Sequence, residues 1–408
     1  MTDERNTLKC IFGRSFDDLQ LRNKLSQLCA TYLGGIWTTV PSEQIRIATQ
    51  RGGSNNKILM VELPDEMKFE YNKSMHKVIL RIYENLNENN ELPEGIITAV
   101  LSERRLSPRL LGIFPGGRFE EYIPSRPLTN DEYCKAWLNI FVAQEVGRIL
   151  ARIHSLDMPI SKECRLAQFV DDMIERLRSS DRWKTQNYPM HTTLAKVDKA
   201  FYPDLITIDL LAEELEICKK CLAQSGSPLV FSNNDLHEGN LLLRDGIKIT
   251  DQGLIGRKDD EDPIILIDYE YGCYYYRGFD LCHYCVECCL HNEGNIWPYY
   301  EVKQNQWPNE AIQRLYISAY IDEAMKICVD NNGKRIQCIR DLSIDREISI
   351  NHLLNEIRQF AAFPHLFWAI WSFEHAEITQ TNFDHFEYAF DRLALYYYWK
   401  SEMLKYLN

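Results

Sequence analysis

Residues 231–243 read Phe-Ser-Asn-Asn-Asp-Leu-His-Glu-Gly-Asn-Leu-Leu-Leu, and this stretch decides the fold. Asp235 is followed five residues later by Asn240, and Asp268 then ends the apolar run Ile264–Ile267. In phosphotransferases one carboxylate orients or deprotonates the acceptor hydroxyl, while an amide and a second carboxylate hold the magnesium ions on ATP. Each of these residue types is common in ordinary turns. Their order, with flanking strand-like segments, predicts a phosphoryl-transfer centre.

The composition describes a globular protein whose main partner is neither nucleic acid nor an anionic membrane. The chain has 408 residues, of which 45% are hydrophobic and 12% aromatic, enough for a substantial core. Its formal net charge is −13, so it has no basic excess to offset phosphate charge. The N-terminus is polar, without an apolar signal core, and the longest aliphatic runs are too short to span a bilayer. We therefore expect a soluble cytoplasmic protein.

Thirteen cysteines are present, and without a secretion signal we expect reduced thiols rather than disulfides. One cluster could suggest a metal site: Cys282, Cys285, Cys288 and Cys289, with His283 and His291 nearby. Three of these cysteines share one helix face, where free Cys packs as a small hydrophobic residue. Zinc sites usually take ligand pairs from two segments, and Cys218 and Cys221 could supply a second pair. Buried thiols remain the simpler interpretation.

The N-terminal part of the chain predicts a small β-rich lobe. We expect a leading helix over 15–33, strands over 44–50, 57–62, 77–83, 110–114 and 118–122, and a helix over 94–104. The Pro-containing stretch 123–127 interrupts this pattern and predicts a hinge. Two domains are therefore expected, over 1–123 and 124–408.

Beyond the hinge the chain is mainly helical. Thr129 and Glu132 form a capping box that opens the first helix. We expect helices over 137–155, 165–179, 206–224, 309–328, 348–376 and 383–405, strands over 241–243 and 264–268, and a polar hairpin excursion over 245–262. The expected fold class is α+β, a protein-kinase-like arrangement of a small β-rich N-terminal lobe and a large mainly helical C-terminal lobe.

The signatures of protein kinases themselves are missing. The sequence has no Gly-x-Gly-x-x-Gly loop, no Val-Ala-Ile-Lys, and no Asp-Phe-Gly followed by a long activation loop and Ala-Pro-Glu. Soon after Asp268 the chain runs into Tyr-Tyr-Tyr-Arg-Gly-Phe-Asp, residues 274–280. A kinase of small molecules therefore fits better than a protein kinase.

Along most of its length the sequence resembles the choline/ethanolamine kinase family. The matching segments are Arg51–Lys57, Ile79–Tyr83, Leu101–Pro108, Gly112–Pro115, Tyr122–Arg126, Asn234–Asn240, Ile267–Tyr271, Tyr276–Asp280 and Phe367–Ser372. The segment Tyr276–Asp280 looks more like choline kinases than dedicated ethanolamine kinases. The resemblance implies ATP- and Mg²⁺-dependent phosphorylation of choline, with ethanolamine as a further acceptor, as the first step of phosphatidylcholine biosynthesis. Family members are often dimers, so a homodimer is one implied assembly.

The resemblance also implies roles for individual residues. ATP would be bound by Arg51, Gly52, Gly53, Ser54, Asn55, Arg81, Glu94, Glu121, Tyr122, Ile123 and Arg126. Arg81 would grip the phosphates with Glu94 as its helix partner, since a guanidinium can contact two phosphate oxygens. The 51–55 loop would cover the phosphates, although taken alone it predicts a hairpin turn. Asp235 would act as the base, and Asn240, Asp268 and Glu270 would hold magnesium.

The implied acceptor is a quaternary ammonium, which cannot donate a hydrogen bond and is recognised by aromatic faces and a nearby carboxylate. The implied substrate residues are Asp235, His237, Glu287, Trp368, Trp371 and Tyr388. Trp368 and Trp371, at i and i+3, share one helix face. Alone, such a pair more often packs in a core; the family resemblance favours the pocket.

Several positions depart from the family. Asn233 replaces a His that normally braces the loop, and Asn can also donate and accept hydrogen bonds. His237 replaces a Gln, Cys288 replaces a Trp that could line the pocket, and Asn292 replaces an aromatic residue. Two alternatives stay open: a kinase of another small alcohol, such as an aminoglycoside-type phosphotransferase, and a catalytically inactive kinase-like binding protein.

Overall fold

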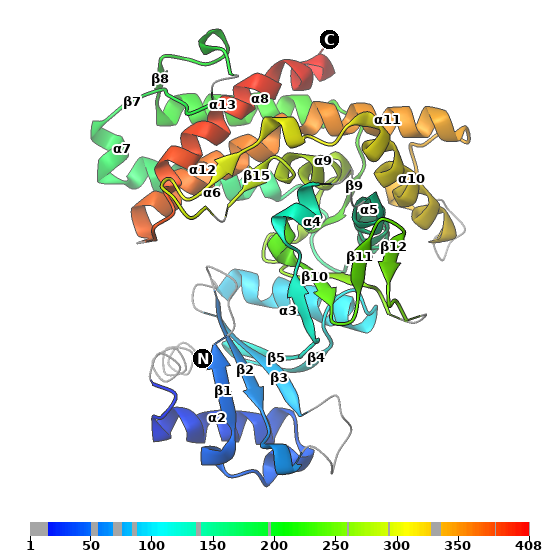
Figure 1. The fold of residues 1–408 in the computed structure, drawn as a ribbon. Coiled ribbons are helices and arrows are strands. Elements are labelled where there is room, and N and C mark those ends of the chain that lie inside the picture. Colours follow the sequence, from blue (N-terminus) through cyan, green and yellow to red (C-terminus); the bar gives the residue numbers. More distant parts are fainter. Residues whose placement is uncertain are drawn as a thin grey trace. The chain divides into compact units, whose positions relative to one another are not determined.

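The computed structural model describes residues 15–49, 56–67, 76–83, 88–135, 140–194, 197–258, 261–292, 294–327, 336–379 and 381–407. The chain forms two compact units (Figure 1). The first runs to Arg126 and also takes in Leu242–Asp245 and Ile265–Glu270, and the second comprises Pro127–Leu241, Gly246–Ile264 and Tyr271–Asn408. The expected hinge at 123–127 includes the point where the first unit passes into the second. Each unit is described separately below.

The first unit is built on a five-stranded antiparallel sheet in the order β1-β2-β3-β5-β4. Its strands are β1 (Arg46–Thr49), β2 (Asn56–Glu62), β3 (Lys77–Tyr83), β4 (Leu110–Phe114) and β5 (Gly117–Glu121). Helices α2 (Leu19–Tyr32) and α3 (Glu88–Glu103) lie on opposite sides of this sheet (Figure 1). The predicted five strands and two helices are therefore confirmed, although α3 begins before residue 94.

Alternation along β3 separates an apolar face of the sheet from a charged one. Val78, Leu80 and Ile82 are buried in one core with the apolar side of α2. The intervening Arg81 must point to the opposite face, because side chains alternate along a strand. Arg118 is its direct neighbour on β5 in the antiparallel register. Two arginines thus lie side by side on the face away from α2.

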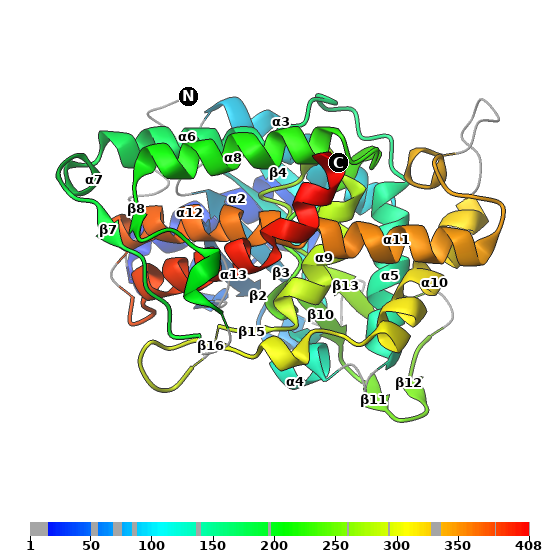
Figure 2. The same ribbon diagram turned by 90° about the horizontal axis from the view of Figure 1, so that it is seen from above.

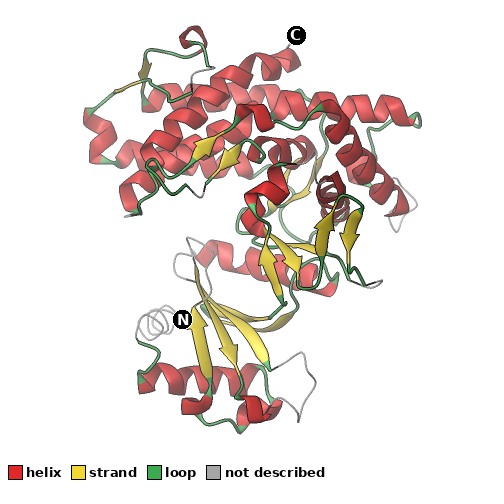
Figure 3. Ribbon diagram, in the orientation of Figure 1, coloured by secondary structure: helices red, strands yellow, loops and turns green. Residues whose placement is uncertain are grey.

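The second unit is mainly helical (Figure 3). Its helices are α4 (Asn130–Cys134), α5 (Ile140–His154), α6 (Leu166–Ser179), α7 (Asp181–Thr185), α8 (Ile208–Ala223), α9 (Arg277–Glu287), α10 (Glu310–Ile327), α11 (Arg346–Phe360), α12 (Ala362–Ile378) and α13 (His385–Met403). Helices α6 and α8 run side by side (Figure 2), and α12 packs along α13, as α5 does along α10. Within the described part of the chain, no helix is long and apolar enough to cross a membrane.

Short strands accompany these helices. Four antiparallel pairs join β7 (Tyr188–Pro189) to β8 (Leu205–Ile206), β9 (Leu229–Ser232) to β14 (Cys273–Tyr276), β11 (Lys248–Thr250) to β12 (Gly253–Ile255), and β15 (Leu290–His291) to β16 (Glu301–Val302). A three-stranded sheet, β13-β10-β6, is made of β13 (Ile264–Leu266), β10 (Leu241–Arg244) and β6 (Ser125–Pro127), and most of its residues belong to the first unit. The predicted hairpin excursion over 245–262 contains the β11–β12 pair and is confirmed.

The predicted extent of one helix was wrong. The single helix expected over 348–376 is two helices, α11 and α12, which meet at Ala361. Pro364 explains the break, because a proline has no N–H to donate to the carbonyl of Phe360 and its ring crowds that carbonyl. By contrast, the capping box is confirmed: Glu132 donates its N–H to Thr129 Oγ1, and Thr129 N–H donates to the Glu132 carboxylate at 2.9 Å.

Candidate active site

The loop that carries Asp235 is anchored by hydrogen bonds to a buried carboxylate. This loop follows β9, whose partner β14 leads directly into α9. Asp280 on α9 is fully buried, and it accepts the backbone N–H groups of Asn233 and Asn234, each at 2.8 Å. Its Oδ2 also lies 3.2 Å from Nε2 of His154. An ionised carboxylate that receives two backbone N–H groups fixes the course of the chain just before Asp235.

Asn233 braces the loop in the way that the sequence led us to expect. Its Oδ1 accepts the backbone N–H of Asp235 at 3.0 Å, and the side chain is fully buried. This is an Asx turn, in which an Asn side chain holds the peptide two residues further on. Asn233 therefore supplies a hydrogen bond at the base of the loop.

Asp235 and Asn240 face each other across the loop. Asn240 Nδ2 donates to the Asp235 carboxylate oxygen Oδ2 at 3.0 Å and to the Asp235 backbone carbonyl at 2.9 Å. Because the amide nitrogen is committed to Asp235, the amide oxygen is the group that Asn240 can offer to a cation. The four-residue spacing thus brings a carboxylate and a hard oxygen donor together within one loop.

His237 lies beside the same carboxylate. Its Nδ1 accepts the backbone N–H of Gly239 at 3.1 Å, so a neutral ring carries its proton on Nε2. Nε2 lies 3.8 Å from Asp235 Oδ2. The folded-back ring requires glycine at 239, because a Cβ there would come within 2.8 Å of His237 Cε1. The neutral imidazole can therefore direct an N–H toward Asp235.

In the first unit, Arg81 faces Asp268. Arg81 Nη1 lies 3.9 Å from Asp268 Oδ1, and Arg81 is almost completely buried. Glu270 follows in the same unit. A buried guanidinium next to a carboxylate is a suitable arrangement for binding phosphate groups together with a cation.

Glu94 forms an ion pair with Arg118, a residue that we did not predict. Glu94 Oε1 pairs with Nη1 of Arg118 at 2.5 Å, and Arg118 Nε pairs with Glu120 Oε1 at the same distance. Tyr83 Oη accepts from Arg118 at 2.9 Å. Burial alone would raise the pKa of Glu120, but the guanidinium groups of Arg118 and Arg81 outweigh burial and lower it. Arg118 thus joins the helix glutamate to the charged face of the sheet.

The remaining predicted ATP residues lie at the end of β5 and beyond it. Glu121 ends β5, Tyr122 receives the Lys77 ammonium over its ring at 4.3 Å, and the Ile123 carbonyl accepts Ser125 Oγ at 2.8 Å. Arg126 lies in β6. Arg51, Gly52, Gly53, Ser54 and Asn55 lie outside the described residues.

An aromatic group forms around the predicted tryptophan pair. Trp368 and Trp371 on α12 have ring centroids 5.4 Å apart and are nearly perpendicular. Tyr271, which we did not predict, joins both: its Oη accepts Trp371 Nε1–H at 2.8 Å, and its ring lies 5.5 Å from that of Trp368. All three side chains are only partly buried. The sequence gives Tyr271 no distinction from the other tyrosines of 269–276, two of which are buried.

The negative charge of Glu287 is balanced by a buried guanidinium. Its Oε1 pairs with Nη1 of Arg392 at 2.9 Å, and the same Nη1 donates to Tyr388 Oη at 3.2 Å. Burial alone would raise the pKa of Glu287, but Arg392 and His283 together lower it to about 2. Arg392 itself is fully buried on α13 and also donates to the Pro364 carbonyl. Arg392 thus brings Glu287 and Tyr388 together and places a positive charge beside them.

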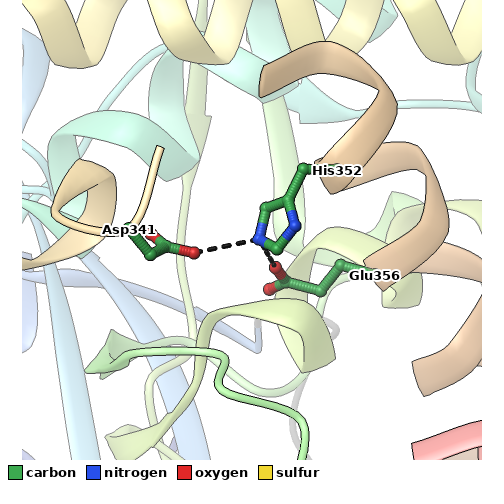
Figure 4. A group of neighbouring side chains, drawn as sticks. All are labelled: Asp341, His352 and Glu356. Carbon is green, nitrogen blue, oxygen red and sulfur yellow. Dashed lines mark hydrogen bonds and ion pairs between the residues drawn. The ribbon is translucent and has the colours of Figure 1, made fainter. Parts of the chain in front are cut away.

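The cysteine side chains of the cysteine-rich segment are buried free thiols, as predicted. Burial raises the pKa of the Cys282, Cys285 and Cys288 thiols, which keeps them protonated. Among the described residues, the one His/Cys/Asp/Glu group with closely spaced ligand atoms is Asp341, His352 and Glu356 (Figure 4).

That group is an ion-pair cluster around Arg277. The fully buried guanidinium of Arg277 contacts both oxygens of Asp341, at 2.7 and 2.8 Å, and also pairs with Glu356. His352 Nε2 lies 3.0 Å from Asp341 Oδ2 and 3.7 Å from Glu356 Oε2 (Figure 4). Because a fixed cation already occupies both carboxylates, a second cation would be repelled there.

Comparison with known proteins gives a consistent result. Residues 47–397 match the family model described as choline/ethanolamine kinase. The choline kinase A2 of Caenorhabditis elegans is 30% identical over 392 residues, covering 93% of this chain and 85% of the relative. The human choline/ethanolamine kinase is 29% identical over 379 residues, covering 92% and 86%. A solved choline kinase from Cryptosporidium parvum Iowa II, 22% identical, superimposes with a TM-score of 0.67 over 94% of this chain and 96% of its own.

Proposed function

The chain belongs to the choline/ethanolamine kinase family, and we propose that it transfers the γ-phosphoryl group of ATP to the hydroxyl of choline, with ethanolamine as a weaker acceptor. The observation that carries this proposal is the group of Tyr271, Trp368 and Trp371, whose partly exposed rings meet in the same unit as Asp235. Each aromatic face contributes about 0.5–2 kcal/mol to binding a cation.

The balanced charge of Glu287 supports choline as the preferred acceptor. A primary ammonium has three N–H donors and needs acceptors in place of its lost water. Glu287 already pairs with the guanidinium of Arg392, so much of its negative charge is neutralised and it attracts a primary ammonium less strongly. A quaternary ammonium needs no hydrogen bond and is satisfied by the aromatic faces.

The chemistry that we assign to the chain is positioning and proton handling. Asp235 would orient the acceptor hydroxyl and receive its proton at a carboxylate oxygen, with Asn240 Nδ2 holding Oδ2 in place. His237 would steady the same carboxylate through its Nε2–H. Arg81 would bind phosphate oxygens of ATP, with Arg118 and Glu94 fixing the charged face behind it.

The donor set suits magnesium. Asn240 offers an amide oxygen, and Asp268 and Glu270 offer carboxylates, all hard oxygen ligands of the kind that Mg²⁺ prefers. When bound, magnesium neutralises the charge on the phosphate oxygens of ATP. We therefore assign Asn240, Asp268 and Glu270 to the metal, and the 51–55 loop and residues 121–126 to the nucleotide, on the strength of the family pattern.

The test is to measure ATP consumption in parallel with choline, with ethanolamine and without an acceptor. Turnover with choline exceeding that with ethanolamine is the expected result. Asp235→Ala should abolish turnover, whereas Asp251→Ala, at an exposed turn between β11 and β12, should leave it unchanged. Turnover with an aminoglycoside alone would favour the other phosphotransferase, and no turnover with any acceptor would favour an inactive binding protein.

A further inference from the structure

We propose that His283 is a positioning residue that ties the catalytic loop to the cation pocket, with its imidazole neutral and protonated on Nε2. The inference rests on the proposed function, because it assigns His283 a part in the same reaction. His283 lies on α9 and is buried, with 1% of its surface exposed. Its two ring nitrogens reach two different parts of the site.

One nitrogen faces the catalytic loop and the other faces the pocket. Nδ1 lies 3.3 Å from the backbone nitrogen of Leu236, the residue after Asp235. Nε2 lies 3.0 Å from the indole nitrogen of Trp368 and 3.4 Å from Glu287 Oε1. The ring also stacks beside that of Trp368, at an interplanar angle of 25°. His283 is thus the direct link from the Asp235 loop to two proposed pocket residues.

Donor and acceptor rules decide between the two neutral tautomers. A backbone N–H and an indole N–H only donate, and an ionised carboxylate only accepts. A neutral imidazole has one acceptor nitrogen and one N–H, so it cannot accept from Leu236 and Trp368 at once. With the proton on Nδ1, the ring accepts from Trp368 only and turns a donor toward the buried Leu236 N–H.

With the proton on Nε2, both buried partners are satisfied. Nδ1 then accepts the Leu236 N–H, and Nε2–H donates to the ionised Glu287. A buried backbone N–H without a partner is costly, and hydrogen bonds to charged groups are among the stronger ones. The same tautomer gives up the hydrogen bond of 3.0 Å from the Trp368 indole N–H to Nε2, and this partly exposed N–H must turn to solvent or to an oxygen of the bound acceptor. The geometry therefore favours protonation on Nε2.

Two substitutions of similar size separate the two ends of this link. His283→Asn keeps an acceptor near the position of Nδ1 and loses the group at Nε2. It should therefore keep kcat within about threefold while the choline KM rises about fivefold, as expected for one lost hydrogen bond. His283→Gln keeps a donor near Nε2 and loses the acceptor for Leu236. Its kcat should fall by ~10- to 100-fold, because the loop shifts, while the choline KM changes little.

A purely structural role would give a different result. In that case both variants would lower the melting temperature and change kcat and KM alike, which would overturn the proposal. His76→Gln is the matched control, because His76 lies in the first unit just before β3 and its Nδ1 has no hydrogen-bond partner. It should leave kcat and the choline KM unchanged even if it lowers the melting temperature.

The tautomer can be measured directly in the wild-type protein. ¹⁵N NMR of histidine-labelled protein, with the His283 signals identified by their absence in either variant, should show a protonated Nε2 and an unprotonated Nδ1. Protonation on Nδ1 would overturn the proposal whatever the kinetic constants of the two variants. If the wild type turned over no acceptor, the proposed function would fail, whereas the tautomer would still be decided by the spectrum.

Discussion

Asn233 and Asp235 are joined by a hydrogen bond of 3.0 Å from the Asp235 backbone N–H to the side-chain oxygen of Asn233, which is fully buried. The backbone N–H of Asn233 itself donates to Asp280. The loop before the proposed catalytic carboxylate is therefore held by its own sequence and by α9. Asn233 thus braces the loop through a local hydrogen bond.

The first prediction concerns this brace. Asn233→Ala leaves the partly buried N–H of Asp235 without this acceptor, which should cost about 1 kcal/mol of unfolding free energy. The loop shift should also lower kcat by roughly tenfold, because small misplacements of a catalytic group are expensive. Asn233→His, the residue that the family resemblance leads us to expect at this position, should retain more activity than the alanine variant. Urea unfolding and steady-state kinetics check both effects, and equal activity of the two variants would contradict the brace.

The second prediction concerns the aromatic group. Trp371→Ala removes one face of the proposed cation pocket and the N–H that holds Tyr271. Losing about 0.5–2 kcal/mol of cation binding should raise the choline KM by roughly 2- to 30-fold. The ATP KM should stay within about twofold of the wild type, because the indole lies in the second unit, on α12.

Tyr271→Phe supplies the control for that experiment, because it keeps the ring and removes only the hydroxyl that accepts from Trp371. It should raise the choline KM less than Tyr271→Ala does. A parallel rise of the ATP and choline KM values in the alanine variants would be inconsistent with a cation pocket.

The third prediction concerns the charged face of the sheet. Arg118→Met leaves Glu94 and Glu120 buried without their cation, and breaking such a pair costs about 3–5 kcal/mol. The matched control is Arg46→Met, on β1 of the same sheet, whose pair with Asp65 is exposed on both sides. That change should cost no more than about 1 kcal/mol. Chemical unfolding of the two variants compares them, and similar losses would refute the special role of Arg118.

The sequence predicted the parts of the site that depend on local spacing. Asp235 and Asn240 lie in one loop, so their contact follows from a separation of five residues. The five strands and most helices likewise follow from patterns of two or 3.6 residues. The break at Ala361 could also have been predicted, because Pro364 stands within the helix that we expected to be continuous.

The residues that the sequence did not predict act through distant partners. Tyr271 is positioned by a hydrogen bond from α12, and Arg392 by the carboxylate of Glu287, 105 residues away. Arg118 is positioned by its register in the sheet, opposite Arg81. In the sequence each is an ordinary aromatic or charged residue within a helix, strand or loop. Only the packing of the elements shows that their charges and rings are buried against one another. The one signal in the sequence was the alternation of the charged Arg118 and Glu120 with the apolar Phe119 along β5, where all three are buried.

The last prediction concerns the pH dependence that Glu287 confers on the unfolding free energy. Its pKa in the folded protein is about 2, against an ordinary value of 4.5, so the folded state prefers the ionised carboxylate. The stability it contributes is therefore fully present above pH 4.5 and is lost as the pH falls from 4.5 through about 2. At about 1.4 kcal/mol per pKa unit, the loss amounts to about 3 kcal/mol.

Glu287→Gln removes this titration and leaves Arg392 without its counter-charge. The variant should therefore be less stable than the wild type at pH 7, and the difference should shrink as the pH falls below 4.5. Glu310→Gln, at an exposed pair with Arg314, should follow the wild-type curve throughout. Unfolding free energies measured between pH 7 and pH 2 check this. A gap between Glu287→Gln and the wild type that stays constant down to pH 2 would show that Glu287 is not held ionised by Arg392.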